Sequence, residues 1–289
     1  MARWIANPRN PLTARVAANH VWLRHFGRGL LPTPSDFGRN GRLPSHPQLL
    51  DWLAAEFMRP SEPAGSSASG DDGRVAAAGW SFRHLHRLIV SSAAYRMAST
   101  PDDANLALDP DNQFLWRMNS RRLEAEAVRD NLLHVTGMLD LATGGPDIDH
   151  KLALSSRRRS IYLRTAAEKQ SEFLQIFDEP SVNECYQRRP SVVPQQALAL
   201  GNSELALKLS RILAGRLERE CGGDQVRFVT LAFRWVLARQ PTAAESEACV
   251  RFLSSPATVA HETAGGRGSR MIDNLVLVLL NHNDFVTVR

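Results

Sequence analysis

Residues 10–57 constrain the fold more than any other part of the chain, because two helical patterns enclose one long loop. Apolar residues recur at three-and-four spacing after Asn10, which is a suitable N-cap, and Gly27 or Gly29 ends this helix. The second pattern begins at Ser45 and runs to Phe57. The loop between them, residues 28–45, is long for a compact domain, so we expect it to be ordered by its own side chains.

One polar residue, Asn19, falls on the apolar stripe of the first helix. The stripe is otherwise formed by Leu12, Val16, Leu23 and Phe26. A buried amide needs hydrogen-bond partners, and the loop that follows is their expected source. Within that loop we expect Phe37 to anchor the backbone and Asp36 to cap nearby amides.

The rest of the chain is mainly helical by the same pattern. Ser81 is the expected cap of one helix, another starts near Arg121, and Thr242 with Glu245 forms a capping box. Residues 159–165 alternate apolar and polar side chains as a strand does. The predicted fold is therefore a mainly α, irregular multi-helix domain with long ordered loops and at most a small β element near residues 159–165.

We expect one helical domain over residues 1–289. Residues 59–79 are rich in small and polar side chains, which cannot bury enough surface to become ordered. We interpret this segment as a disordered surface insertion and not as a domain boundary.

Composition argues against several classes of protein. The chain has a net charge of +5, but only three of its 35 basic residues are lysines and the arginines are spread along the sequence, so we do not expect nucleic-acid binding. The longest apolar stretch, residues 275–280, is too short to span a membrane, and no signal peptide is visible at the start. The three cysteines have no metal or haem spacing, so we expect neither a cofactor nor a metal, and their pairing stays open.

An ordered series of motifs resembles a bacterial family, domain of unknown function 1553. The motifs include Asn10–Val16, His25–Leu30, Thr33–Gly38, Pro44–Leu53, Leu85–Val90, Arg121–Glu126, Pro194–Leu200, Arg239–Thr242 and Leu279–Asn281. The resemblance implies the C-terminal module of planctomycete-type multidomain proteins that often carry cytochrome c domains. It also implies an exported or periplasmic location, with upstream domains of the same protein as partners.

The densest group of polar residues lies between residues 162 and 196. We predict a ligand-binding site formed by Tyr162, Arg164, Asp178, Cys185, Arg188, Arg189 and Gln195. Paired arginines suit capture of a carboxylate, sulfate or phosphate group. The alternative is that Arg189 and Asp178 pair internally and merely hold the segment together.

Four further residues are secondary candidates: His25, Asp36, His46 and Glu126. His25 ends the first helix, where a histidine can also cap backbone carbonyls. Glu126 and Asp130 lie one helical turn apart and could act as acid and base, but a salt-bridge lattice with Arg122 and Arg129 explains the same residues without catalysis, and we prefer it. No catalytic residue is assigned.

Two functional hypotheses follow. The first is an accessory or interaction module of a larger exported protein, with an anionic or carbohydrate ligand. The second is part of a periplasmic oxidoreductase or polysaccharide-processing enzyme that an upstream domain completes. The sequence does not decide whether the chain is an enzyme.

Overall fold

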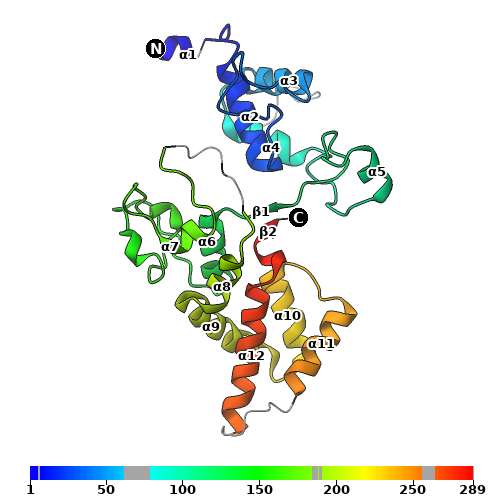
Figure 1. Ribbon diagram of the computed structural model, residues 1–289, viewed down its shortest axis with the longest axis vertical. Coiled ribbons are helices and arrows are strands. Elements are labelled where there is room, and N and C mark those ends of the chain that lie inside the picture. The colour runs from blue at the N-terminus through cyan, green and yellow to red at the C-terminus, as the bar shows by residue number, and fades with distance from the viewer. Residues whose placement is uncertain (6, 62–78, 184–187, 189–190, 256–263, 289) are drawn as a thin grey trace, which may run out of the picture. The chain divides into compact units, whose positions relative to one another are not determined.

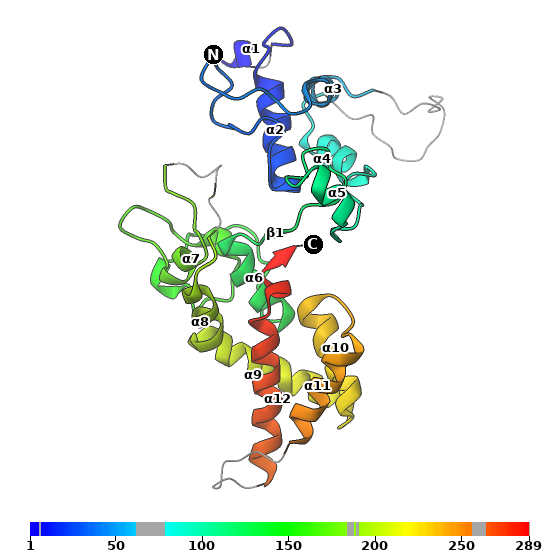
Figure 2. The same cartoon turned by 45° about the vertical axis from the view of Figure 1, so that its right-hand side comes forward.

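The computed structural model describes residues 1–5, 7–61, 79–183, 188, 191–255 and 264–288, without the side chains of residues 264–269. It is mainly helical, as the sequence predicts, and has one small antiparallel pair of strands. The chain divides into two compact units, residues 1–121 and 122–288, which Figures 1 and 2 show. The single domain expected over residues 1–289 stays a prediction, and most of the expected insertion at 59–79 lies outside the described residues.

The first unit is built on three helices that pack together. Its helices are α1 (Ala2–Ile5), α2 (Thr13–Phe26), α3 (Pro47–Met58), α4 (Phe82–Ser91) and α5 (Asp103–Leu108). Helix α2 packs against α3 and α4. Its buried face agrees with the predicted one only in part: Asn19 and Phe26 are buried as expected, while Leu12 stays exposed. The other inward positions are taken by Ala14, Ala18, Val21 and Trp22. Small side chains let a neighbouring helix approach more closely than a row of leucines would.

The predicted capping residues of this unit are confirmed. The Oδ1 atom of Asn10 accepts from the amides of Leu12 and Thr13, at 2.9 and 3.4 Å. Gly27 ends α2 with a φ of +76°, a left-handed conformation that glycine adopts without strain. The hydroxyl of Ser81 accepts from the amide of His84 at the start of α4.

The buried amide of Asn19 is satisfied by the loop, as predicted. Its Nδ2 donates to the carbonyl of Leu31 at 3.0 Å, and its Oδ1 accepts from the Leu31 amide at 2.8 Å. A Cβ on Gly29 would lie 2.6 Å from that carbonyl and 2.9 Å from the Asn19 amide atoms, so only glycine fits there. Phe37 packs against the core and Asp36 accepts from the Gly38 amide at 2.8 Å, which confirms both predicted roles.

The second unit is a layered helical bundle. It contains α6 (Ala125–Val135), α7 (Glu172–Ile176), α8 (Pro194–Asn202), α9 (Glu204–Cys221), α10 (Gln225–Leu237), α11 (Ala243–Ser254) and α12 (Ala264–Leu280), with short 3-10 turns at His150–Leu152, Ser160–Tyr162 and Asn283–Phe285. Helices α9 and α12 lie side by side along most of their length (Figures 1 and 2). Strand β1 (Arg121–Arg122) pairs with β2 (Thr287–Val288), next to a hydrogen bond from the Leu123 amide to the Val286 carbonyl at 2.8 Å.

The β element expected near residues 159–165 is very small. Ser160–Tyr162 forms a 3-10 turn, and Leu163 makes an isolated bridge to Ile148. The Ile148 amide donates to the Tyr162 carbonyl at 2.7 Å, and the Ile148 carbonyl accepts from the Arg164 amide at 2.8 Å. The residues just before this segment are held by a fully buried arginine of α6, Arg129, which donates to the carbonyls of Ala153, Ser156 and Arg158 at 2.6 to 2.9 Å. The segment therefore obtains its strand-like hydrogen bonds from one neighbouring residue and not from a full partner strand.

The motif Arg239–Thr242 joins three elements of this unit. The Arg239 guanidinium binds Glu245 at 2.7 and 2.9 Å and Asp284 at 2.8 Å. Glu245 also completes the predicted capping box with Thr242, which is confirmed. The Arg239 charge lowers the pKa of Glu245 to about 2, so this link persists through the neutral and mildly acidic range.

Candidate functional site

Arg188, a predicted ligand-binding residue, reaches the start of helix α6. Its Nη1 lies 2.5 Å from Oε2 of Glu126 and its Nη2 lies 3.1 Å from Oε1, while Oε2 of Glu124 is 3.6 Å away. Burial alone would lower the pKa of Arg188, but these carboxylates outweigh it and the pKa is raised. The guanidinium of Arg188, which was expected to capture an anion, is therefore already neutralised by carboxylates of its own unit.

Asp178 organises the backbone around this pair. It has a φ of +64°, and its carboxylate accepts from the amide and hydroxyl of Ser191, both at 2.7 Å. Gln196 lies beside it, only 3% exposed, donating to the Ile176 carbonyl at 3.0 Å and accepting from Arg122 at 2.8 Å. Every polar contact of this group is internal, which is the pattern of a brace and not of an open binding site.

Glu179 is a member of this region that the sequence analysis missed. Its Oε1 accepts from the Thr165 hydroxyl at 2.9 Å, while its Oε2 is buried without a hydrogen-bond partner among the described residues. Burial raises the pKa of Glu179, and the nearby Glu126 adds to the increase while Thr165 and Arg188 oppose it. A carboxylic acid with a raised pKa is a known form of proton donor.

Tyr162 and Arg164 lie apart from the Arg188 pair and hold a different loop. Arg164 forms an exposed ion pair with Asp147. The Tyr162 hydroxyl accepts from the Gly144 amide at 3.0 Å, and the Arg158 guanidinium stacks 3.9 Å from the Tyr162 ring centre. These contacts fasten the glycine-containing turn at residues 144–147. Thr165, through Glu179, links this segment to the Arg188 region.

Some predicted site residues lie outside the described part of the chain, and other predictions need correction. Cys185 and Arg189 fall outside the described residues, so the predicted pairing of Arg189 with Asp178 does too. Gln195 is on the surface, and its neighbour Gln196 takes the buried position. The lattice predicted along α6 is confirmed in part, because Nη1 of Arg129 lies 3.5 Å from Oδ1 of Asp130. Tertiary contacts replace the rest: Glu126 binds Arg188, Arg122 binds Gln196, and Asp130 also accepts from the Ser160 amide and hydroxyl, both at 2.7 Å.

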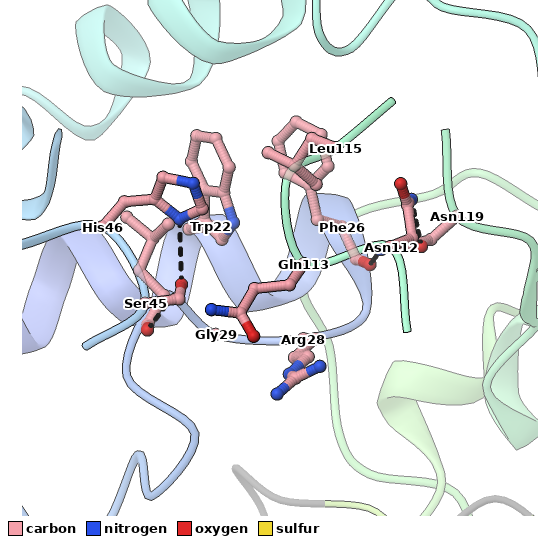
Figure 3. A pocket seen from close by; sticks show the side chains of 11 residues that line it. Trp22, Phe26, Arg28, Gly29, Ser45, His46, Asn112, Gln113, Leu115 and Asn119 are labelled. Atoms are coloured by element: carbon pink, nitrogen blue, oxygen red, sulfur yellow. Dashed lines mark hydrogen bonds between the residues drawn. The ribbon is translucent and has the colours of Figure 1, made fainter. Parts of the chain in front are cut away.

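A second gathering of polar groups lies in the first unit, around a shallow pocket (Figure 3). The pocket encloses only about 20 Å³, and about 330 Å³ is reached only when the open solvent at its mouth is counted, so a ligand larger than water would lie across the mouth. Its apolar lining consists of Trp22, Phe26, Leu30 and Leu115. Its polar lining consists of Arg28, Ser45, His46, Asn112, Gln113 and Asn119, with the backbone of Gly29 between them. The family-like segment 10–57 thus supplies one wall and a turn at residues 109–119 supplies the other.

Ser45 connects His46 to the loop. The Ser45 hydroxyl lies 3.2 Å from the Leu30 carbonyl and 3.0 Å from Nδ1 of His46. In the tautomer in which Nδ1–H donates to Ser45, the Nε2 atom of His46 carries a lone pair, and it has no hydrogen-bond partner among the described residues. His46 thus helps to order the loop, and in this tautomer it also offers an acceptor.

The turn that forms the opposite wall is rigid and strained. Asn112 and Leu115 have φ values of +51° and +57°, which only a surrounding network can hold. The Asn112 amide donates to the Arg117 carbonyl at 2.7 Å and to Asn119 at 2.8 Å, and Asn119 donates to the Phe26 carbonyl at 3.0 Å. Strained backbone of this kind often marks a functional site.

His25 contacts another histidine instead of capping the helix carbonyls. Its Nε2 lies 2.8 Å from Nδ1 of His86, and its ring meets the Tyr95 ring edge-on at 5.4 Å. Burial lowers the pKa of His25, and His86 and Arg121 lower it further. The two family-like histidines, 61 residues apart, therefore form one hydrogen-bonded pair.

Because of this histidine pair, we predict that acidification lowers the free energy of unfolding. Because the pKa of His25 in the folded chain lies below its ordinary value of 6.5, the unfolded chain takes up the proton first. Stability is therefore full above about pH 6.5 and falls as the pH drops toward the folded-state pKa. Urea titrations between pH 8 and pH 5 should show a smaller pH slope for His25→Gln than for the wild type. Some slope should remain, since burial lowers the pKa of His20 as well. An unchanged slope in the variant would remove His25 as the cause.

The pocket residues that sequence reasoning missed are Arg28, Gln113 and the adjacent Phe114. Arg28 lies inside the motif His25–Leu30, so its position was already marked. Gln113 and Phe114 follow residues 109–112, whose sequence predicts a turn and nothing more. Their approach to His46 depends on tertiary packing across more than 60 residues, which no local pattern encodes.

Among the residues described, no group of three or more His, Cys, Asp or Glu side chains is placed to hold a metal ion. Cys221 and Cys249 are free thiols, and burial raises the pKa of both. No helix in the described parts of the chain is long and apolar enough to cross a membrane.

Comparison with protein families gives one match. The model of the family described as "Protein of unknown function (DUF1553)" matches residues 1–253 of this chain. The chain therefore belongs to this family, as its motifs indicate, although Leu279–Asn281 lies beyond the match. No curated protein and no solved structure gave a significant match.

Proposed function

As a member of this family of unknown function, the chain is, we propose, an accessory binding module that holds an anionic or carbohydrate ligand without transforming it. The observation that carries the proposal is a difference in charge balance. Arg164 and Arg188 are neutralised by Asp147 and Glu126, whereas Arg28 lines a pocket without an ion pair to any described residue. An uncompensated arginine at a pocket is the group best suited to attract an anion.

The chemistry of the pocket favours holding over reacting. None of the 11 described residues that line it is a carboxylate or a thiol. Ser45 and His46 are in contact, but the Ser45 hydroxyl also lies 3.2 Å from the Leu30 carbonyl, which competes with His46 for its proton. A nucleophilic serine needs its proton given to the histidine, with a third group to orient the ring, and no carboxylate lines the pocket to do this.

The setting of the module follows from the resemblance described above. Planctomycete-type relatives join this domain to cytochrome c and other modules and are exported, so we place this chain in a protein of that kind. Its second unit has large apolar side chains on the surface, among them Val192 (80% exposed) and Ile161 (71% exposed). Such side chains suit contact with an upstream domain of the same protein.

A second function, part of an enzyme completed by another domain, is favoured by Glu179. Its raised pKa would keep it protonated at higher pH than an ordinary glutamate, and Glu126 lies nearby. Two neighbouring carboxyl groups can act as acid and base. Glu126 is already paired with Arg188, so the other domain would have to displace Arg188 before Glu126 could react.

One experiment separates the two functions. The full chain, alone and joined to its upstream domains, is incubated with acidic oligosaccharides while binding and product formation are followed together. The accessory function predicts a reversible complex and unchanged ligand. Product that forms with the wild type and is lost with Glu179→Gln would contradict it and support the enzyme. The isosteric Glu172→Gln, an exposed glutamate in α7, is the matched control.

A further inference from the structure

We propose that the pocket of the first unit binds one acidic sugar residue, a hexuronate or a sulfated hexose, with its anionic group at Arg28 and its ring against Phe114. This inference rests on the proposed function and names its ligand class. It moves the anion site from the segment predicted by sequence, residues 162–196, to the family-like loop and the turn facing it.

Arg28 supplies the charge. It is exposed, it follows the C-cap Gly27, and it meets no carboxylate among the described residues. On the opposite wall, Asp109 is engaged, since its two oxygens accept from the amides of Gln113 and Phe114 at 2.9 and 2.8 Å. Asp111, on the same turn, is exposed but does not line the pocket, so an anion at the pocket meets the Arg28 guanidinium and no carboxylate of the lining.

Phe114 supplies a surface for a sugar ring. Its side chain is 73% exposed, an unusual position for a large aromatic residue, and its ring lies 6.1 Å from the His46 ring in an edge-on arrangement. The negative face of an aromatic ring attracts the weakly positive C–H bonds on the apolar face of a pyranose. Aliphatic ligands without such a face would gain less from this residue.

Two polar groups between these anchors suit hydroxyl groups. Figure 3 shows the Gln113 amide between His46 and Ser45 on one side and Arg28 on the other. The amide offers both a donor and an acceptor, and Nε2 of His46 offers an acceptor. A sugar carries hydroxyl donors and acceptors on neighbouring carbons, so it can use all of them at once, whereas a bare anion can use only the donors.

The pocket is preorganised to hold these groups in place. The turn that carries Gln113 and Phe114 is fixed by Asp109 from one side and by the strained, buried Asn112 from the other. The loop that carries Arg28 is fixed by Asn19 through Leu31. Walls held in this way lose little conformational entropy when a ligand binds.

The test measures binding of galacturonate, sulfated galactose and galactose to the full chain, by calorimetry and by the fluorescence of Trp22, which lines the pocket. The three sugars share one ring and differ only in the group on the exocyclic carbon. We expect both acidic sugars to bind about tenfold or more tightly than galactose, the difference that one charge-assisted contact provides. Acetate and inorganic sulfate should bind at least about tenfold more weakly than the acidic sugars, because they lack a ring.

Matched variants locate the site. Arg28→Ala should reduce binding of the acidic sugars to the level of galactose, while Arg39→Ala, an exposed arginine of the same loop outside the lining, should change nothing. Phe114→Ala should weaken all three sugars, and Leu108→Ala, 85% exposed in α5, should not. Circular dichroism and thermal unfolding confirm that each variant is folded.

The outcomes separate the inference from the proposed function. Acidic sugars that bind Arg28→Ala and Phe114→Ala as well as the wild type would overturn the inference and leave the module's function standing. Equal binding of galactose and galacturonate, or of sulfate alone and sulfated galactose, would also overturn it. Absence of binding to any sugar or anion would contradict the proposed function itself.

Discussion

Replacing Arg129 by methionine should lower the free energy of unfolding of the second unit by about 3–5 kcal/mol, the range for removal of a buried charged partner. The side chain is 0% exposed and holds the carbonyls of Ala153, Ser156 and Arg158 together with the Ser160 hydroxyl. Methionine fills most of the volume but donates no hydrogen bond, so three carbonyls would lose their partner. Burial lowers the pKa of Arg129, yet its guanidinium stays protonated at neutral pH.

Urea unfolding followed by circular dichroism measures this effect. Arg129→Lys is the informative control, since it keeps the charge but cannot reach three carbonyls and a hydroxyl at once. We expect it to be intermediate. The exposed Arg157→Met, in the same segment, should cost little. A loss below about 1 kcal/mol for Arg129→Met would mean that water replaces the guanidinium and that the segment is held by other contacts.

Replacing Asn19 by leucine should destabilise the first unit by about 2–4 kcal/mol, because two buried backbone groups of Leu31 would lose their partner. Asn19 is 0% exposed and Leu31 is 6% exposed, so solvent cannot replace the amide. Leucine has a similar size and suits a helix, hence the cost reports the hydrogen bonds and not a cavity. The loop carrying Arg28 should loosen as well, and ligand binding in the pocket should weaken with it.

Asn19→Asp separates the two hydrogen bonds. An aspartate still accepts from the Leu31 amide, but its second oxygen would face the Leu31 carbonyl and repel it unless protonated. This variant should therefore regain stability as the pH falls, opposite to the effect predicted for His25. Unfolding measured at pH 7 and pH 5 tests the difference in sign. If Asn19→Leu were as stable as the wild type, the loop would be ordered by Phe37 and its turns alone.

Local signals explain which parts of the fold could be predicted. Asn10, Gly27, Ser81 and Thr242 act through backbone groups within a few residues, so their roles are written in the adjacent sequence. The partners of Asn19 were predictable for a related reason. A polar residue on a buried helix face needs hydrogen-bond partners, and the loop of residues 28–45 follows directly in the sequence. The alternation at residues 159–165 indicated a small β element, but its bridge partner, Ile148, lies in a segment without a strand pattern and could not be identified from the sequence.

The candidate site was harder to predict because charge partners are set by tertiary packing. Arg188 and Glu126 are 62 residues apart, and nothing in the sequence shows that they neutralise each other. Arg28 has the same residue type and no partner among the described residues, yet its local sequence looks no more functional. Whether an arginine is paired within the protein or remains available to bind a ligand is therefore decided by the folded structure and not by the local sequence.

The hydrogen bond between Leu123 and Val286 has a consequence for how this domain can be combined with others. The second unit begins and ends at one point, because β1 and β2 are paired. A unit whose two ends meet can be cut out, circularly permuted or inserted into a host loop without stretching either sequence. Residues 122–288 therefore form a unit in which the first and last described residues are tied together by backbone hydrogen bonds.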